Sequence, residues 1–412
     1  MQAYLREKIQ SKAFLIGKLE QIAEISFLGA LFVLPFSKAA LEFLLSAAGV
    51  SWFFSKIASG STLSHKQFLF LVMGLFVVSS SVSAFSSGFP LIAVRGIVKV
   101  IKYSLVLLIT ADLSRNPDKL KRICIVGLFC FMLVVADATV QRIAGRDLLS
   151  GIPVQYADQQ IRLTAPFRAY GLLGAFLIGT LPVLASFGLI KGKIHIGKRI
   201  LLLILFGMGI YILYKTHSRG AWLAAFGSWV LFFLMTRNKY LIFAFAIFLL
   251  IAFFALPRNA LIHLDTEQKE QSLVERYYLW DRAIHVIKAR PWFGCGINTY
   301  TRNYLGFDQT KNWRVPGYYV HNGYLQIGAE TGLVSLFLFV FLLGIGLRSG
   351  YTAFRRSTDA KKPFIAGLIT GFVALLLQAS VDTTLHNTQS AVLIWFFLGL
   401  LIASNDRVKT ES

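Results

Sequence analysis

The sequence has 412 residues, of which 56% are hydrophobic and only 15% are charged. Soluble domains have about a quarter of their residues charged, so the composition excludes a water-soluble enzyme and a disordered chain and indicates a membrane protein. Lys and Arg number 42 against 20 Asp and Glu, a formal net charge of +22. In a soluble protein this excess would favour a nucleic-acid partner, whereas in a membrane protein cytoplasmic loops collect basic residues.

The N-terminal residues and the cysteines exclude two further classes. Residues 1–21 are polar and basic, and no small-residue cleavage site follows the first apolar run, so we expect a cytoplasmic tail and no cleaved signal peptide. The cysteines are Cys124, Cys130 and Cys295. Their spacing excludes a disulfide framework and a Cys-x-x-Cys metal or redox pair.

A spanning helix needs roughly 20 mostly apolar residues, and the sequence offers about twelve such segments. In chain order they lie at 22–36, 38–54, 67–84, 90–113, 122–140, 169–190, 200–214, 220–236, 239–256, 323–347, 363–382 and 389–403. The first two are close enough to form either a hairpin or a re-entrant pair. The expected fold is an all-α polytopic membrane protein.

The basic residues assign an orientation to these spans. With the N-terminus in the cytoplasm, more than half of the 42 Lys and Arg fall in short inner loops and tails, where the positive-inside rule applies. Both termini are then cytoplasmic, and the nucleic-acid interpretation fails because the basic residues do not gather in one domain. The expected organisation is a tail at 1–21, spans one to nine at 22–256, a periplasmic loop domain at 257–320, spans ten to twelve at 321–403 and a tail at 404–412.

Three cations lie on one face of the fourth expected span. Arg95, Lys99 and Lys102 recur at four- and three-residue steps, and charges at membrane depth are costly unless a cavity or an anion receives them. The alternative is that residues 90–103 form an interfacial helix.

The outer face carries further arginines. The segment 141–168 contains Arg162 and Arg168, and the eighth span opens with His217-Ser218-Arg219-Gly220. The small residues around Arg219 permit close helix packing, which would turn this arginine inward, whereas an arginine at a span end usually snorkels to lipid headgroups.

The long outer loop contains an amphipathic helix and a turn. Apolar residues at three- and four-residue steps predict a helix over 267–289, and Arg276 lies beside its apolar stripe. Arg276 therefore either snorkels or points into a pocket. Pro291 follows, and Gly294 and Gly296 predict a sharp backbone turn.

His321 lies where this loop becomes the tenth span. The positive end of a helix dipole disfavours imidazolium, so a histidine here suits a general base. The alternative is a histidine that only caps the helix. Outer-face arginines, one histidine and few carboxylates together favour an anionic ligand with phosphate oxygens, and we expect a lipid-linked diphosphate.

The sequence resembles the O-antigen ligase/polymerase superfamily of bacterial inner membranes. The resemblance covers roughly residues 160–345 and rests on motifs in a fixed order. These are Ser218-Arg219-Gly220, Ser272-x-x-x-Arg276-x-x-x-Trp280, Pro291-x-x-Gly294-x-Gly296, and His321-Asn322 with Glu330 and Gly332. It implies a GT-C-like fold and a metal-independent, inverting glycosyltransferase that needs no cofactor.

Within this superfamily, the resemblance implies an O-antigen ligase. Such an enzyme moves polysaccharide from undecaprenyl diphosphate to a sugar hydroxyl of lipid A-core at the periplasmic face. The resemblance implies that His321 deprotonates the acceptor and that Arg219 and Arg276 hold the diphosphate. The sequence departs from the family around residues 162–171, where an expected Pro-Asn is missing. Arg162, Arg168 and Arg95 therefore enter as weaker donor-site candidates.

Several alternatives stay open. Within the superfamily they are an O-antigen polymerase and a protein O-oligosaccharyltransferase. The second alternative is less favoured, because such enzymes often carry an extra periplasmic domain after the last spans, whereas about nine residues follow the last expected span here. From another class, about twelve spans suit a transporter of lipid-linked glycans, although no internal repeat is visible. Asp265, Glu267 and Glu270 are close in sequence but are interpreted as a solvated helix start, and no metal is expected.

Overall fold

The chain was analysed as a computed structural model, which describes residues 1–60, 67–157, 160–189, 195–237, 267–307 and 319–411. Nearly all of the described structure is helical. The helices are α1 (Gln2–Val33), α2 (Lys38–Ser59), α3 (Gln67–Val82), η2 (Ser83–Ser86), α4 (Pro90–Leu113), α5 (Pro117–Ala144), α6 (Tyr170–Leu189), α7 (Ile196–Lys215), α8 (Arg219–Thr236), α11 (Glu267–Ala289), α12 (Tyr300–Asn303), η4 (Tyr304–Phe307), α13 (Gly323–Arg356), α14 (Lys362–Ala379) and α15 (Thr388–Glu411). Two short strands, β1 (Gln155–Ala157) and β2 (Gln160–Arg162), pair antiparallel.

Nine helices within the described part of the chain are long and apolar enough to cross a membrane. They are α2, α3 with η2, α5, α6, α7, α8, α13, α14 and α15. The all-α polytopic class is thereby confirmed, whereas the count of about twelve is not. Helices α1 and α4 occupy expected span positions but carry charges along their length, and the expected span at 239–256 lies outside the described residues.

The first two helices form a hairpin and not a re-entrant pair. Helices α1 and α2 pack along each other, and α2, at 22 residues, has the length of a full span. Ser37 ends the turn between them, because its hydroxyl accepts a hydrogen bond from the Ala40 N–H at 3.2 Å. This side-chain cap satisfies a backbone donor that the first helical turn leaves unpaired.

Helix α4 is one continuous helix that includes residues 90–103. Its second half is buried against α15. Gly399 of α15 allows the close approach, since a Cβ there would lie 2.8 Å from the Leu107 carbonyl oxygen. Small residues serve the same purpose between α6 and α14, where Gly371 faces the Gly179 carbonyl. Such contacts let membrane helices pack backbone to backbone.

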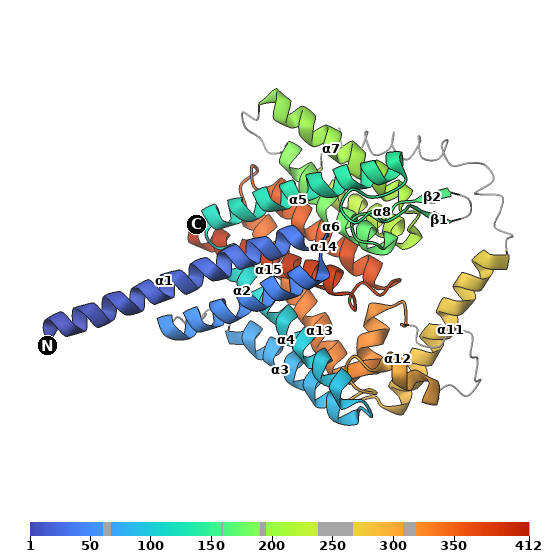
Figure 1. Ribbon diagram of the computed structural model, residues 1–412, viewed down its shortest axis with the longest axis horizontal. Helices are drawn as coiled ribbons and strands as arrows, with labels where there is room; N and C mark the ends of the chain where they lie inside the picture. Colours follow the sequence, from blue (N-terminus) through green and yellow to red (C-terminus); the bar gives the residue numbers. More distant parts are fainter. Residues whose placement is uncertain (61–66, 158–159, 190–194, 238–266, 308–318, 412) are drawn as a thin grey trace.

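Figure 1 shows both chain ends at one end of the bundle and the elements β1, β2, α11 and α12 at the other. We call this second end the hairpin end. The two long connections that the sequence places on one face, residues 141–168 and the α11 region, therefore do meet at one end of the molecule. The predicted helix over 267–289 is confirmed as α11.

Helix α13 is kinked at Gly332, which has φ +81°. The turn predicted from Pro291, Gly294 and Gly296 packs into this kink. The Leu333 N–H donates to the Pro291 carbonyl at 2.7 Å, and the Cys295 N–H donates to the Ala329 carbonyl at 2.9 Å. A Cβ on Gly332 would overlap the Trp292 carbonyl. Two motifs that are separate in the sequence thus form one locked unit.

Candidate functional site

His321 lies one residue outside the cap of α13. Asn322 is the cap, because its Oδ1 accepts from the N–H groups of Tyr324 and Leu325, both at 3.1 Å. The alternative that His321 only caps the helix is therefore wrong. Its own backbone is left-handed, with φ +53°. The imidazole is 32% exposed, so it is held at the edge of the protein and still accessible.

The residue facing His321 is Asp382, in the loop between α14 and α15. The His321 Nδ1 and Asp382 Oδ1 atoms are 3.7 Å apart. Burial works against ionisation of this carboxyl, but the His321 side chain, the Thr383 N–H and the positive charge of Arg276 outweigh it. The pKa of Asp382 is consequently lowered, and an anion lies beside the histidine. A carboxylate in this place orients an imidazole and stabilises the imidazolium formed when it accepts a proton.

Arg276 of α11 reaches the same loop. Its Nη1 donates to the Val381 carbonyl at 3.2 Å, and its charge acts on Asp382. The side chain is half-buried. Arg276 therefore turns toward the loop that carries Asp382, the residue facing His321.

Arg219 is the first residue of α8. Ser218 caps the helix through a hydrogen bond from the Ala221 N–H at 3.4 Å. The close packing expected here is present, since a Cβ on Gly220 would lie 2.9 Å from the Val381 side chain. It does not bury Arg219, however, whose side chain is exposed, because the first position of a helix projects beyond the packed part. Arg219 and Arg276 therefore border the same turn at Val381 from two helices.

The two arginines of the 141–168 segment have different surroundings. Arg162 stacks on Tyr170, with its guanidinium carbon 3.8 Å from the ring centroid, and donates to the His217 carbonyl at 3.2 Å. It is thereby fixed two residues from Arg219. Arg168 is exposed with φ +62°, three residues before Gly171. A Cβ on Gly171 would lie 2.9 Å from Asp382 Oδ2, so this turn also borders the site.

Arg95 is exposed on α4. Within the described ranges, no contact joins it to His321, Arg219 or Arg276. The three cations expected on one face of the fourth span do not share one environment. Lys99 and Lys102 are half-buried and bonded, whereas Arg95 is exposed.

Glu330 holds the turn after α11 against α13. Its carboxylate is buried and accepts from the Asn298 N–H at 2.8 Å, the Tyr300 N–H at 3.4 Å and the Gln326 side chain at 3.1 Å. These bonds occupy the carboxylate, so Glu330 is a positioning residue. Ser272 of the motif lies in a part of α11 whose side chains are not described.

Backbone strain gathers at the hairpin end. Arg168, His217, Asn298 and His321 all have φ between +50° and +62°. Each such residue costs on the order of 1 kcal/mol or more and is typical of functional sites. The strain therefore falls on the residues that the contacts above bring together.

Sequence reasoning missed Asp382. It was placed inside the expected span 363–382, whereas α14 ends at Ala379. The missed signal is the charge itself, because a carboxylate within an apparent span is by default a functional candidate. In the described ranges no three His, Cys, Asp or Glu side chains come together as metal ligands; Asp265 lies outside these ranges, and the side chains of Glu267 and Glu270 are not described.

The fold and the site define a polytopic helical membrane protein with a histidine, a carboxylate and arginines gathered at one end of the bundle. A model of the family described as O-antigen ligase matches residues 201–340, which include Arg219, Arg276 and His321. This match supports the resemblance of the region to the O-antigen ligase/polymerase superfamily. The matched region points to a glycosyltransferase-like membrane enzyme. A comparison with curated proteins gives no match.

Proposed function

We propose that this protein is an O-antigen ligase. It transfers polysaccharide from undecaprenyl diphosphate to a sugar hydroxyl of lipid A-core, as a step of lipopolysaccharide biosynthesis. The observation that carries the proposal is the convergence on one turn, Val381–Asp382, of the partner of His321, the guanidinium of Arg276 and the start of α8 with Arg219.

The reaction follows from the roles of these groups. The acceptor hydroxyl oxygen attacks the anomeric carbon of the donor glycan, and the bond from that carbon to the diphosphate oxygen breaks. His321 accepts the hydroxyl proton as general base. The undecaprenyl diphosphate leaves with its charge stabilised by Arg219 and Arg276. Attack opposite the leaving group inverts the anomeric configuration.

Asp382 acts through His321. Its carboxylate fixes the ring on one side and leaves the other nitrogen for the acceptor, which is the arrangement that general-base histidines need. Arg162 is proposed to support the donor side, because its stacked guanidinium is held beside the residues that precede Arg219.

The proposal also assigns a place in the cell. The protein is a bacterial inner-membrane enzyme with a GT-C-like arrangement, both termini in the cytoplasm and the hairpin end in the periplasm. The distribution of basic residues supports this orientation, and so does the position of both chain ends opposite the hairpin end (Figure 1).

The decisive experiment offers purified protein the lipid-linked glycan donor with two acceptors side by side, lipid A-core and a second lipid-linked glycan. We expect a new glycosidic bond to lipid A-core and no chain extension of the second acceptor. Extension of the lipid-linked glycan alone would identify a polymerase. Movement of donor across a reconstituted bilayer without a new glycosidic bond would identify a transporter and overturn the proposal.

A further inference from the structure

A second polar cavity lies beside His321 and is not used by the mechanism above. Its volume is about 90 Å³. Its polar lining comes from α4, from the turn after α11, from α13 and from the last loop: Lys99, Tyr103, Asn298, Gln326, Glu330 and His386. Aromatic side chains such as that of Trp395 complete the wall. Most of the lining surface is apolar, with a few placed polar groups, which is the usual composition of a small-molecule site.

Lys99 is the cation in the lining of this cavity, and it has hydrogen-bonding capacity to spare. Its Nζ donates to Asn298 Oδ1 at 3.1 Å, and no carboxylate of the described residues lies within ion-pair distance. An ammonium group has three N–H donors. Glu330, the carboxylate of the cavity wall, is already occupied by the donors named above.

Asn298 holds Lys99 in place. Its side-chain Nδ2 donates to the Ile92 carbonyl at 3.2 Å, and its backbone N–H donates to Glu330 at 2.8 Å. With φ +61°, the residue is fixed in a strained conformation, and its Oδ1 accepts from Lys99. Neighbouring Gly96 of α4 packs against Asn298 and Ile297, which leaves no space for a different arrangement.

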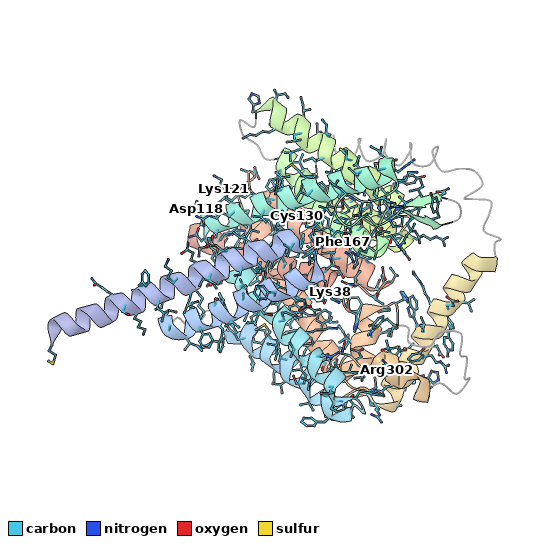
Figure 2. All side chains as sticks on the ribbon, viewed as in Figure 1. Lys38, Asp118, Lys121, Cys130, Phe167 and Arg302 are labelled. Atoms are coloured by element: carbon cyan, nitrogen blue, oxygen red, sulfur yellow. The ribbon has the colours of Figure 1, made fainter. Side chains whose placement is uncertain are left out.

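Lys99 and the buried Glu330 carboxylate both line the cavity, and Lys38 adds a second positive charge from outside the lining. Burial and then the charges of Lys99 and Lys38 lower the pKa of His386 to about 3, so His386 is neutral and adds no charge. Lys38 begins α2, at the end of this helix that faces the middle of the bundle (Figure 2), and its charge also acts on Lys99 and Lys102. Lys102 is paired with Glu42, which leaves Lys99 and Lys38 to attract an anion.

The cavity and the two arginines belong to different elements around the segment that carries His321. The wall of the cavity is tied to the histidine segment, because Gln326 Oε1 accepts from the Val320 N–H at 3.2 Å and Gln326 Nε2 lies 3.4 Å from His386 Nδ1. None of its described lining residues belongs to α8 or α11. A donor held by Arg219 and Arg276 would therefore meet a second substrate, bound in the cavity, at the imidazole.

We propose that this cavity is the acceptor subsite and takes an anionic sugar, one that bears a phosphate or a carboxylate, with Lys99 as the residue that binds the anion. The assignment of this cavity to the acceptor substrate rests on the proposed function. The binding of an anionic saccharide to Lys99 does not depend on it.

The test measures binding of deacylated lipopolysaccharide core oligosaccharide, which carries both kinds of anion, to the purified full-length protein by calorimetry. Lys99→Gln keeps a donor for Asn298 and removes the charge. We expect its Kd to rise roughly 10- to 100-fold, the range of a charge-assisted hydrogen bond. Lys99→Arg should restore most of the affinity. Lys121→Gln, an exposed lysine of α5 at the opposite end of the molecule (Figure 2), is the matched control and should bind normally.

Two further arms identify the anion. If the anion is a phosphate, phosphatase treatment of the oligosaccharide should weaken its binding to wild-type protein to the level seen for the untreated oligosaccharide with Lys99→Gln. If the anion is a carboxylate, reduction of the carboxyl groups should have this effect instead. An unchanged Kd for Lys99→Gln, or a rise in the KM for the donor alone, overturns the proposal. If binding depends on Lys99 but wild-type protein transfers glycan to no acceptor, the subsite stands and the proposed function fails.

Discussion

At His321, the structure combines three properties that a general base needs. The ring is partly accessible, its backbone is held in a strained conformation, and the anionic side chain of Asp382 is 3.7 Å from its Nδ1. The first two properties belong to the segment before α13, and the third comes from the loop between α14 and α15. The sequence locates the histidine, whereas the partner lies some sixty residues further on and is found only in the folded protein.

Replacement of His321 by Ala should reduce glycan transfer by about 10²–10⁴-fold, the usual contribution of a general base, while the protein still inserts into the membrane. Initial rates of the purified variant, with membrane insertion checked by fractionation, measure this. His195→Ala is the matched control, because His195 is exposed and only caps α7. Transfer at the normal rate by His321→Ala would show that the base is another residue.

Arg219→Ala and Arg276→Ala should each lower kcat by about 10²–10³-fold, because each removes a charge that stabilises the leaving diphosphate. Arg302→Ala, which removes an exposed arginine of α12 at the same end of the bundle (Figure 2), should leave kcat unchanged. Equal losses in all three variants would mean that only the general positive potential matters.

Asp382→Asn should lower kcat by at least about tenfold, because the imidazole loses the anion that orients it. The double variant with His321→Ala should be no slower than His321→Ala alone, since residues that act as one unit are not additive. Additive losses in a double-mutant cycle of transfer rates would separate Asp382 from the base.

At the scale of elements, the kink of α13 and the turn after α11 explain why both motifs contain glycines. Gly332 has φ +81° and lies against the Trp292 carbonyl, while Gly294 and Gly296 have φ +62° and +108°. The turn was predicted from the sequence, because Pro and Gly are strong local signals. The partner of the turn was not predicted, because contact between distant segments has no local signature.

Gly332→Ala should destabilise the protein by roughly 1–3 kcal/mol, the cost of overpacking a well-packed site, and should lower transfer because the segment with His321 shifts. Thermal unfolding in detergent measures the change. Gly344→Ala in the same helix is the control, since a Cβ there meets nothing within 4 Å among the described residues. If both variants unfold at the same temperature, the packing of the turn after α11 against the kink of α13 does not contribute to stability.

At the scale of the whole molecule, the membrane class and most span positions were predictable because apolar length is read directly from the sequence. The nine candidate spans agree with nine of the expected segments. The expected count of about twelve is not confirmed, since α1 and α4 carry charges and one segment is not described. Which charged residues of α4 turn inward, Lys99 and Lys102 but not Arg95, depends on Glu42 and Asn298, and helical spacing alone cannot reveal it.

Stability should fall with acid because of His386. Its pKa is lowered to about 3 in the folded protein, against about 6.5 when unfolded, so the unfolded state binds more protons between these values. The stabilisation is complete above about pH 6.5 and is lost as the pH falls toward 3, by roughly 1 kcal/mol at pH 5.5. The Tm difference between pH 7.5 and 5.5 should be smaller for His386→Gln; an unchanged difference would assign the acid sensitivity elsewhere.

Chelators should leave transfer unaffected, because the proposed reaction uses a histidine base and arginines and none of its steps requires a metal ion. Rates with and without a chelator test this. Loss of activity that Mg²⁺ or Mn²⁺ restores would require a metal site and a revised mechanism.

The loop between α14 and α15 has a consequence for biosynthesis. It supplies Val381 to Arg276, Asp382 to His321 and His386 to the neighbouring cavity, and it follows Arg219, Arg276 and His321 in the sequence, so it leaves the ribosome after them. A nascent chain that has already inserted both arginines and the histidine still lacks the parts that join them. We therefore expect the proposed site to be complete only after α14 and α15 have entered the membrane, which would keep an unfinished chain from acting on lipid-linked glycan.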